Sequence, residues 1–585
     1  MTKRAMGNLV NRYRSVLKKC HLINTFGSLA VAAILVMGVT DGEAFSNAVG
    51  YNVTSTSTPG TTVSVTDTSE NAVASGIKAE TSATYSVPST ITRAEATAIG
   101  KQSALSLGVF AQSSSGNRLT VNLAPLDISS TAVTENGSSR SVGIYSDVNS
   151  SVSVHGGTIV SSAHSKNGIA EAFGAMSQNN SSVTLGADSI VLSAESSKKL
   201  SDPRTVGIYF SDNSTFNVTS NRIRVDVSAT HNGDVFSRKV NGIYGDKNST
   251  LTMNDADISV REINSTPDKS GAAGIHLFTA STLAMKDASI RVAAVDHEGT
   301  FAGSAIGIVT SPTSGRHDIT AGTLDIRAQG GWASGIQLEN TDMRMAGGTV
   351  MSSGLGRSAY GIRTTHANFT ATGDIDVTTH ADRSNSTVGG ILAVGKSSIT
   401  MRGGSVTASS NGDGGAIGLY AKDGGSITKT GGDITVVSAG ITSGMDAFPT
   451  SKITYGDAKA TTRISVEGRD AYGVRARGQA GSDQAASIEL TNGVIEARSH
   501  GDTAIAAYSA SGDIGLKGTT AITATAAAPG KKVYSLYVEG DRPNSITVDK
   551  ASTIEGDIEA ATGSATVRHP GWRQPAGLGT QPWRS

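Results

Sequence analysis

Short apolar runs recur along most of the chain, separated by polar segments of similar length. Each run opens with a small residue, usually glycine, and continues with an aliphatic residue and often an aromatic or charged one. We call the small residue and the aliphatic residue after it an anchor. The ten clearest anchors are Gly143-Ile144, Gly207-Ile208, Gly242-Ile243, Gly274-Ile275, Gly307-Ile308, Gly335-Ile336, Gly361-Ile362, Gly390-Ile391, Gly418-Leu419 and Gly473-Val474.

Weaker copies fill the gaps in this series and extend it in both directions. They are Gly76-Ile77, Gly108-Val109, Gly174-Ala175, Gly444-Met445, Ala504-Ile505 and Ser535-Leu536. From Gly76 to Ser535, neighbouring copies are 26 to 35 residues apart. A period of about 20 to 50 residues held over many copies predicts a protein built from stacked repeats.

Two further runs follow each anchor, and in both of them apolar and polar residues alternate. Residues 249–253 and 257–260 are one example, and residues 281–285 and 289–292 are the next. Alternation with a period of two predicts half-buried strands, and the Asn, Asp, Gly and Ser residues between runs favour turns. The sequence therefore predicts an all-β fold: a single-stranded right-handed parallel β-helix, a solenoid with about three short strands per coil and about 16 coils.

Other repeat architectures match this pattern less well. A leucine-rich horseshoe needs a helical or tighter return segment, and no sustained helical periodicity follows the N-terminus. A β-propeller needs four strands and recurring aromatic residues in each blade of about 40 to 50 residues, whereas aromatic residues are 5% of this chain. An array of β-sandwiches would place a domain boundary about every 100 residues, and none is visible.

The first residues have the order of a secretory signal. A basic segment that runs to Lys19 precedes the apolar residues 29–39, and two small-x-Ala sites follow. This order predicts a signal peptide over residues 1–48, cleaved after Ala44 or Ala48, and export across the inner membrane. The apolar stretch is too short for a helix that spans a membrane, which needs about 20 residues. A buried N-terminal helix, the alternative, accounts less well for the small-residue sites.

Charge and cysteine content narrow the class of protein further. Without residues 1–48 the chain has 43 basic and 47 acidic residues, a net charge of −4. No basic stripe remains to neutralise phosphates, so a nucleic-acid partner is not expected. The single cysteine, Cys20, lies inside the predicted signal, so the mature chain would have no disulfide in an oxidising compartment.

The long basic signal, the cysteine-free repeats rich in Ser, Thr, Gly and Asn, and anchors such as Gly143-Ile144-Tyr145 together resemble the passenger domain of a Gram-negative type V autotransporter of the pertactin-like kind. The resemblance covers residues 49–566. It implies passage through the periplasmic export machinery, a final place on the cell surface or in the medium, and contact with host surfaces, matrix or other bacterial cells.

The C-terminal residues depart from this family. An autotransporter continues into a membrane β-barrel, whereas residues 567–585 are a tail with three prolines and two tryptophans that we expect to be disordered. This departure suggests a truncated passenger that lacks its translocator. For this chain alone, the expectation is accumulation in the periplasm.

Two function hypotheses follow from these observations. The first is a monomeric, non-enzymatic surface, adhesion or interaction protein without a cofactor, a metal site or catalytic residues. The alternative is a β-helical carbohydrate-active enzyme of the polysaccharide lyase or glycosidase type. Glycoside hydrolysis needs two carboxylates on either side of the scissile bond, so an enzyme would need acidic residues at matching places on successive coils.

The acidic candidates for such chemistry do not cluster in neighbouring repeats. They are Asp255, Asp257, Asp287, Asp374, Asp376, Asp433, Glu489 and Glu496. Most fall at corners, where aspartate has an ordinary structural cause because its side chain bonds nearby backbone groups. We therefore interpret most of them as turn residues.

Three further groups of residues have a functional and a structural interpretation. His155, His231, His317 and His380 occur singly, without metal-ligand spacing, and are expected to be exposed strand or turn residues. Asn213 and Asn248 begin Asn-Ser-Thr triplets at corners and are interpreted as turn residues rather than glycan acceptors. The residue after the anchor, for example Tyr145, Tyr209, Tyr244, Arg363, Tyr420 or Arg475, could form a contact ladder, although stacking between coils is the favoured interpretation.

Overall fold

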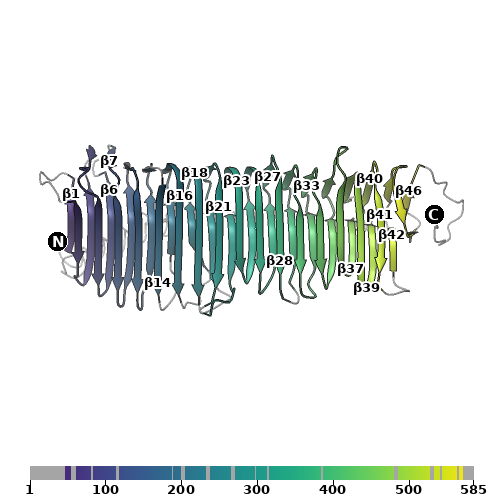
Figure 1. Ribbon diagram of the computed structural model, residues 1–585, viewed down its shortest axis with the longest axis horizontal. Helices are drawn as coiled ribbons and strands as arrows, with labels where there is room; N and C mark the ends of the chain where they lie inside the picture. Colours follow the sequence, from purple (N-terminus) through teal and green to yellow (C-terminus); the bar gives the residue numbers. More distant parts are fainter. Residues whose placement is uncertain are drawn as a thin grey trace, which may run out of the picture.

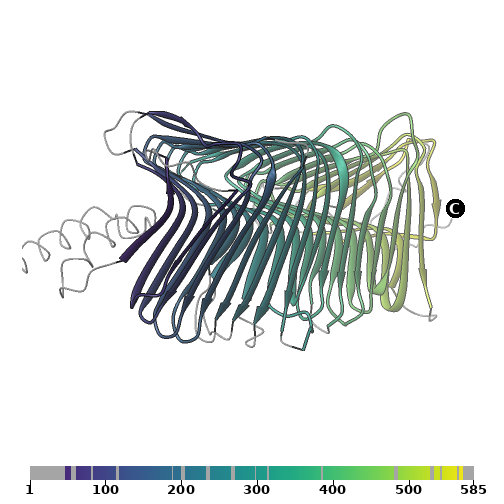
Figure 2. The same cartoon turned by 60° about the vertical axis from the view of Figure 1, so that its left-hand side comes forward.

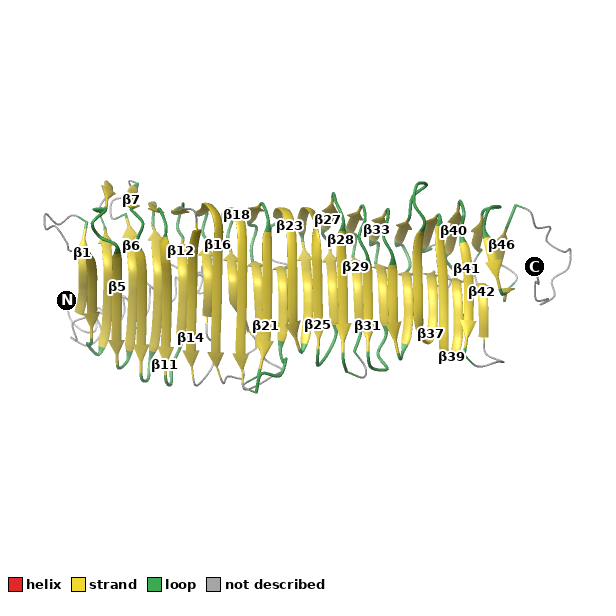
Figure 3. Cartoon of the chain, viewed as in Figure 1, coloured by secondary structure: helices red, strands yellow, loops and turns green. Residues whose placement is uncertain are grey.

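The computed structural model describes residues 46–53, 61–80, 83–113, 118–186, 189–198, 204–231, 237–264, 270–296, 298–311, 315–383, 386–479, 485–527, 532–540, 543–562 and 565–570. These residues form 46 strands and no helix, as the yellow strands and green loops of Figure 3 show. None of the described residues forms a helix long and apolar enough to cross a membrane. The predicted signal peptide lies almost entirely outside the described residues, because only its last three residues, 46–48, belong to them.

The strands form three parallel sheets that run the length of the molecule. Each coil contributes one strand to each sheet in a fixed order, which we call the anchor, middle and closing sheets. The strands follow one another along the long axis from the N-terminal to the C-terminal end (Figure 1), and the turned view shows successive coils side by side like ribs (Figure 2). The predicted all-β parallel solenoid with about three strands per coil is confirmed, and the coil number agrees approximately with the prediction.

The anchor sheet carries the repeated Gly-Ile phrases. Its strands, in order, are β1 (Ser46–Asn52), β3 (Asn71–Ala79), β6 (Ser103–Gln112), β9 (Ser138–Asp147), β12 (Ala170–Ser177), β15 (Arg204–Phe210), β17 (Ser237–Gly245), β19 (Ser270–Leu277), β22 (Ser304–Thr310), β24 (Trp332–Glu339), β26 (Ala359–Thr365), β29 (Val388–Val394), β32 (Ala416–Lys422), β35 (Ile441–Ala447), the second parts of β37 (Thr462–Arg477) and β39 (Gly493–Ala510), β42 (Lys532–Glu539) and β45 (Asp557–Ala560).

The middle sheet follows the corner after each anchor strand. Its strands are β4 (Thr84–Ser86), β7 (Leu119–Leu123), β10 (Ser150–Val154), β13 (Ser182–Leu185), the first parts of β16 (Thr215–His231) and β18 (Thr250–Asn264), β20 (Thr282–Met285), the first parts of β23 (His317–Gly330) and β25 (Thr341–Gly354), β27 (Asn368–Ala371), β30 (Ser398–Met401), β33 (Ser426–Lys429), β36 (Lys452–Tyr455), β38 (Ser487–Thr491), β40 (Asp513–Lys517), β43 (Asn544–Val548) and β46 (Ala565–Arg568).

The closing sheet leads back to the next anchor strand. Its strands are β2 (Thr62–Asp67), β5 (Arg93–Gly100), β8 (Asp127–Thr134), β11 (Gly157–Ser165), β14 (Ser189–Lys198), the second parts of β16 and β18, β21 (Ala288–Val295), the second parts of β23 and β25, β28 (Ile375–Ala381), β31 (Val406–Ser410), β34 (Ile434–Ser438), the first parts of β37 and β39, β41 (Ala521–Ala526) and β44 (Thr553–Glu555).

Alternation along each strand fills the interior with one apolar row per sheet. Ile208, Ile243 and Ile275 pair in register across three coils and are fully buried. The interior cluster is continuous from Tyr51 near one end to Ala565 near the other. Each coil buries only a thin layer, so its backbone and side chains depend on the coils above and below.

Glycine begins the anchors because the space beside it is already filled. A Cβ placed on Gly242 would lie 2.3 Å from the Ile258 Cγ2 atom of the closing sheet and 2.6 Å from the carbonyl oxygen of Gly274 in the next coil. Gly242 is not among the residues with positive φ. Close approach of two sheets therefore selects glycine at this position, rather than a turn conformation.

Register corrects two details of the sequence analysis. Val474 pairs with Ala507, not with Ile505, so the anchor of that coil is Ala506-Ala507 and the predicted Ala504-Ile505 is wrong by two residues. At the C-terminal end, Val567 and Arg568 pair with Ile546 and Thr547. The solenoid therefore continues two residues into the segment predicted as tail, and residues 571–585 lie outside the described residues.

Candidate functional site

Several of the acidic candidates link one coil to the next. Asp287, Asp376 and Asp433 each accept a hydrogen bond from a backbone N–H about one repeat further on, that of Thr323 (2.6 Å), Ser405 (2.7 Å) and Arg463 (3.0 Å). The backbone and side-chain hydrogen bonds from Ser405 lower the pKa of Asp376. Asp287 and Asp433 lie at corners, as expected. Asp376 lies within β28, and Asp257, Glu489 and Glu496 lie within β18, β38 and β39, so the turn interpretation is wrong for these four residues.

The other acidic candidates are engaged by basic side chains on the outer surface. Asp257 bonds Arg222, and Asp255 lies 3.7 Å from Lys286. Glu489 accepts from Lys517 at 2.6 Å and Glu496 from Arg463 at 3.3 Å. Ion pairs of this exposed kind contribute little to stability, and they leave these carboxylates with ordinary structural partners.

Three of the acidic candidates act electrostatically on the same buried side chain, that of Lys429. Asp374, Asp376 and Asp433 all raise its pKa electrostatically, although burial has the larger effect and lowers it to about 8. Lys429 itself is fully buried at the end of β33. Its ammonium donates hydrogen bonds to the carbonyl oxygens of Gly403, Gly404 and Gly431. The buried lysine therefore holds the backbone of this corner in place.

Two of the four histidines contradict the sequence analysis. His155 is exposed and His380 is partly exposed, 2.6 Å from Asp382, but His317 is fully buried and His231 is 3% exposed. The alternation along the strand indicates this burial. Val225, Val227, Ala229 and His231 occupy every second position, and the first three face the interior. A histidine that continues such a series faces the core as well.

His231 is paired inside the solenoid. Its Nε2 atom lies 2.7 Å from the Oε1 atom of Glu262 in the next coil, and the Glu262 side chain is 1% exposed. Burial raises the pKa of Glu262, and the hydrogen bond from His231 opposes that rise. Among the residues that the structure describes, no group of three His, Cys, Asp or Glu side chains could hold a metal ion.

Asparagine corners connect the anchor and middle sheets in four coils near the N-terminal end. Asn149, Asn180, Asn213 and Asn248 have φ values of 53°, 59°, 60° and 57°. Asparagine tolerates this left-handed conformation better than most residues. The following serine is buried in each case, and the turn interpretation of Asn213 and Asn248 is confirmed.

The residues after the anchors face outward and stack between coils. In the N-terminal half, Phe110, Tyr145, Met176, Tyr209 and Tyr244 belong to a second apolar cluster, separate from the interior one. The rings of Tyr209 and Tyr244 are parallel, with centroids 5.4 Å apart. Stacking, the favoured interpretation, is therefore confirmed for Tyr209 and Tyr244, and these rings are almost fully buried.

The same outer face is more open in the C-terminal half. We call Tyr420, Phe448, Tyr472, Tyr508 and Tyr537 the aromatic strip; all five are partly exposed. Ring centroids are 5.2 Å apart for Tyr420 and Phe448, 5.5 Å for Tyr472 and Tyr508, and 5.8 Å for Tyr508 and Tyr537. The rings thus form two groups, Tyr420 with Phe448 and Tyr472 with Tyr508 and Tyr537. Register offsets the groups across the sheet, because the residue of β35 that pairs with Tyr472 is Ser443.

A buried carboxylate organises the centre of this strip. Asp446 is fully buried and accepts hydrogen bonds from two guanidinium groups, those of Arg475 and Arg477. The Arg475 guanidinium lies 4.6 Å from the Tyr472 ring centre, and that of Arg477 lies 4.3 Å from the Phe448 ring centre. Arg475 was singled out from the sequence, but its link to Asp446 was not, because the two lie in different repeats.

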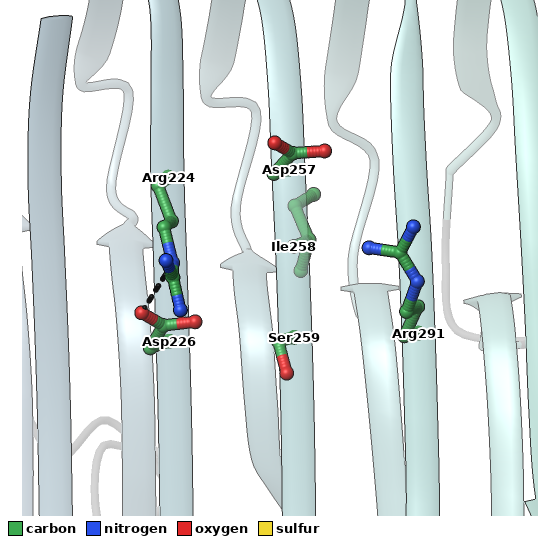
Figure 4. A pocket seen from close by; sticks show the side chains of 6 residues that line it. All are labelled: Arg224, Asp226, Asp257, Ile258, Ser259 and Arg291. Carbon is green, nitrogen blue, oxygen red and sulfur yellow. Dashed lines mark ion pairs between the residues drawn. The ribbon is translucent and has the colours of Figure 1, made fainter.

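A charged hollow of about 260 Å³ lies on the outer face of the closing sheet. Figure 4 shows its lining: Arg224, Asp226, Asp257, Ile258, Ser259 and Arg291. Arg224 and Asp226 form an ion pair of 2.7 Å, and the Arg224 side chain is 63% exposed. The hollow is therefore a shallow surface feature whose charges are largely balanced within the lining.

No protein-family model, curated protein or solved structure gives a match to this chain.

Proposed function

We propose that this chain is an exported β-helical passenger of the autotransporter type, which acts as a non-enzymatic protein in contact with host surfaces, matrix or other bacterial cells. The single observation that carries the proposal is the outer face of the anchor sheet. Five successive coils of it carry partly exposed rings, those of Tyr420, Phe448, Tyr472, Tyr508 and Tyr537, and an arginine lies against two of these rings. A solenoid presents such a face as an extended binding surface.

The engagement of the acidic candidates supports a binding role over the enzymatic alternative. Asp287, Asp376 and Asp433 are held by backbone N–H groups of the next coil. A carboxylate that acts as a general acid needs a raised pKa, whereas that of Asp376 is lowered. The enzymatic alternative therefore has less physical support than the binding role.

A binding assay with an enzymatic arm separates the two functions. We expect the purified protein to bind immobilised matrix or whole cells in a saturable way, and to release no reducing or unsaturated sugar ends from a panel of polysaccharides. Turnover of any polysaccharide would favour the enzymatic alternative. Absence of binding to every surface would contradict the proposed function.

A further inference from the structure

A histidine and a glutamate from neighbouring coils meet inside the solenoid. The Nε2 atom of His231, the last residue of β16, lies 2.7 Å from the Oε1 atom of Glu262 in β18, and both side chains are buried. The Nδ1 atom of His231 has no hydrogen-bond partner among the residues that the structure describes, and the backbone of Gly271 in β19 also bonds Glu262. The pair therefore joins two strands of the closing sheet to a strand of the anchor sheet.

The strands packed around the pair place no charged group against it, among the side chains that the structure describes. In register, Glu262 lies between Ala229 of β16 and Ala294 of β21, and both alanines are buried. The nearest described titratable side chains along these strands and along β14, β17 and β19 lie on the outer face or at a corner; they are Glu195, Asp226, Tyr244, Arg261, His276 and Asp296. The charge of the pair therefore depends on its own protons.

One titratable proton decides whether the pair is charged. With this proton, the pair is either an imidazolium and a carboxylate or an imidazole and a carboxylic acid, and neither form has a net charge. Without it, a carboxylate stays buried beside a neutral imidazole, and a buried charge without a counter-ion is costly. Burial accordingly raises the pKa of Glu262, although hydrogen bonds from His231 and Gly271 oppose the rise. The resulting stability is fully present below the ordinary value of 4.5 and is lost as the pH rises through the folded pKa.

We propose that the His231–Glu262 pair makes the coils from β16 to β19 a pH-sensitive segment of the solenoid, which is tight when the pair holds one proton and loosens when that proton is lost. Both residues lie near the ends of their closing strands, where the chain turns toward the next anchor strand. Because repeat proteins transmit local changes mainly to neighbouring repeats, the effect is confined to these coils. This inference goes beyond the proposed function and does not depend on it.

Amide hydrogen exchange of the purified protein, followed by mass spectrometry, tests this inference. Exchange is compared at about pH 5 and about pH 8, the range in which histidine changes charge, after correction for the intrinsic effect of pH on the exchange rate. Peptides from β16 to β19 should be less protected at the higher pH by on the order of tenfold, the ratio that corresponds to one unit of pKa difference between folded and unfolded chains. The exposed pair of His380 and Asp382 provides an internal control, because peptides from β28 and β31 should not lose protection at the higher pH.

Two variants should change the pH response in opposite directions. Glu262→Gln removes the buried negative charge and keeps an oxygen that accepts the hydrogen bond from His231, so protection should be as high at the higher pH as at the lower. With His231→Gln an amide donor to Glu262 remains, but only the carboxyl group can hold the proton, so protection should be lost at a lower pH than in the unmodified protein. A variant that merely damages the fold would lose protection at every pH. His380→Gln, which alters the exposed pair, should leave exchange from β16 to β19 unchanged.

Equal protection of β16 to β19 at the two pH values in the unmodified protein would overturn the inference, and this comparison needs no variant. It would also be overturned if Glu262→Gln kept the loss of protection at the higher pH. A loss of the same size in β28 and β31 would show a general effect of pH on the solenoid, and the pair would then have no special role.

Discussion

Lys429 gains hydrogen bonds inside the thin solenoid, and burial destabilises its charged form. Its ammonium donates hydrogen bonds to the carbonyl oxygens of Gly403, Gly404 and Gly431 at a buried corner. Burial nevertheless disfavours the charged form and lowers its pKa from 10.5 to about 8. The same residue thus bonds the backbone of this corner and makes its contribution to stability depend on pH.

The pH dependence of stability follows from this lowered pKa. Between about pH 8 and pH 10.5 the unfolded chain binds more protons at Lys429 than the folded chain does. The free energy of unfolding therefore rises with pH in this window, and this contribution is lost as the pH falls through the folded pKa. The full difference is on the order of 3 kcal/mol. Lys429→Met should abolish this pH-dependent contribution, although it also removes the three hydrogen bonds to the carbonyl groups.

Chemical denaturation at several pH values between 7.5 and 10.5 checks this expectation. The free energy of unfolding of the unmodified protein should rise relative to that of Lys429→Met as pH increases. A difference between the two proteins that stays constant over this range would contradict the buried, deprotonation-prone lysine.

At the scale of single strands, the anchor strand is the element on which each coil depends. Ile243 of β17 is fully buried and pairs in register with Ile208 and Ile275 in the coils on either side. Gly242 beside it allows the closing sheet to approach. One strand therefore fixes both the stacking of neighbouring coils and the width of the interior.

Ile243→Asp should open the solenoid locally. A carboxylate without a partner in this interior costs several kilocalories per mole through desolvation, and repeat proteins transmit such damage mainly to neighbouring repeats. Limited proteolysis should therefore show new cleavage between residues 207 and 274. Thr252→Asp, which places the same charge at an exposed position of β18, is the control and should leave the cleavage pattern unchanged.

The elements also show which features the sequence could predict. The strands were predictable because each alternates over several residues and the anchors recur. The anchor Ala506-Ala507 was not, since alanine occurs in both inward and outward positions and carries little pattern of its own. Contacts such as Arg477 with Asp446 join residues 31 positions apart, and side-chain geometry across coils cannot be derived from spacing alone.

The whole molecule is a rod whose sheets run along its length (Figure 1). Paired strands lie about 4.8 Å apart, so the 18 strands stacked in the anchor sheet give a length of roughly 80 Å. Small-angle scattering of the purified protein should give the profile of an elongated particle of about this length, and its far-UV spectrum should be dominated by β-structure. A compact globular profile would contradict the fold.

The glycines that begin the anchors limit how such a rod can vary in length. Gly242 and Gly274 occupy equivalent places, and each is fitted against the closing sheet and against the carbonyl of the next glycine in the same way. Removal of residues 242–273 would bring Gly274 into the position of Gly242 and delete one entire coil, whereas removal of half that number would misalign every row beyond it. The molecule is therefore modular, and its length can change only in whole units.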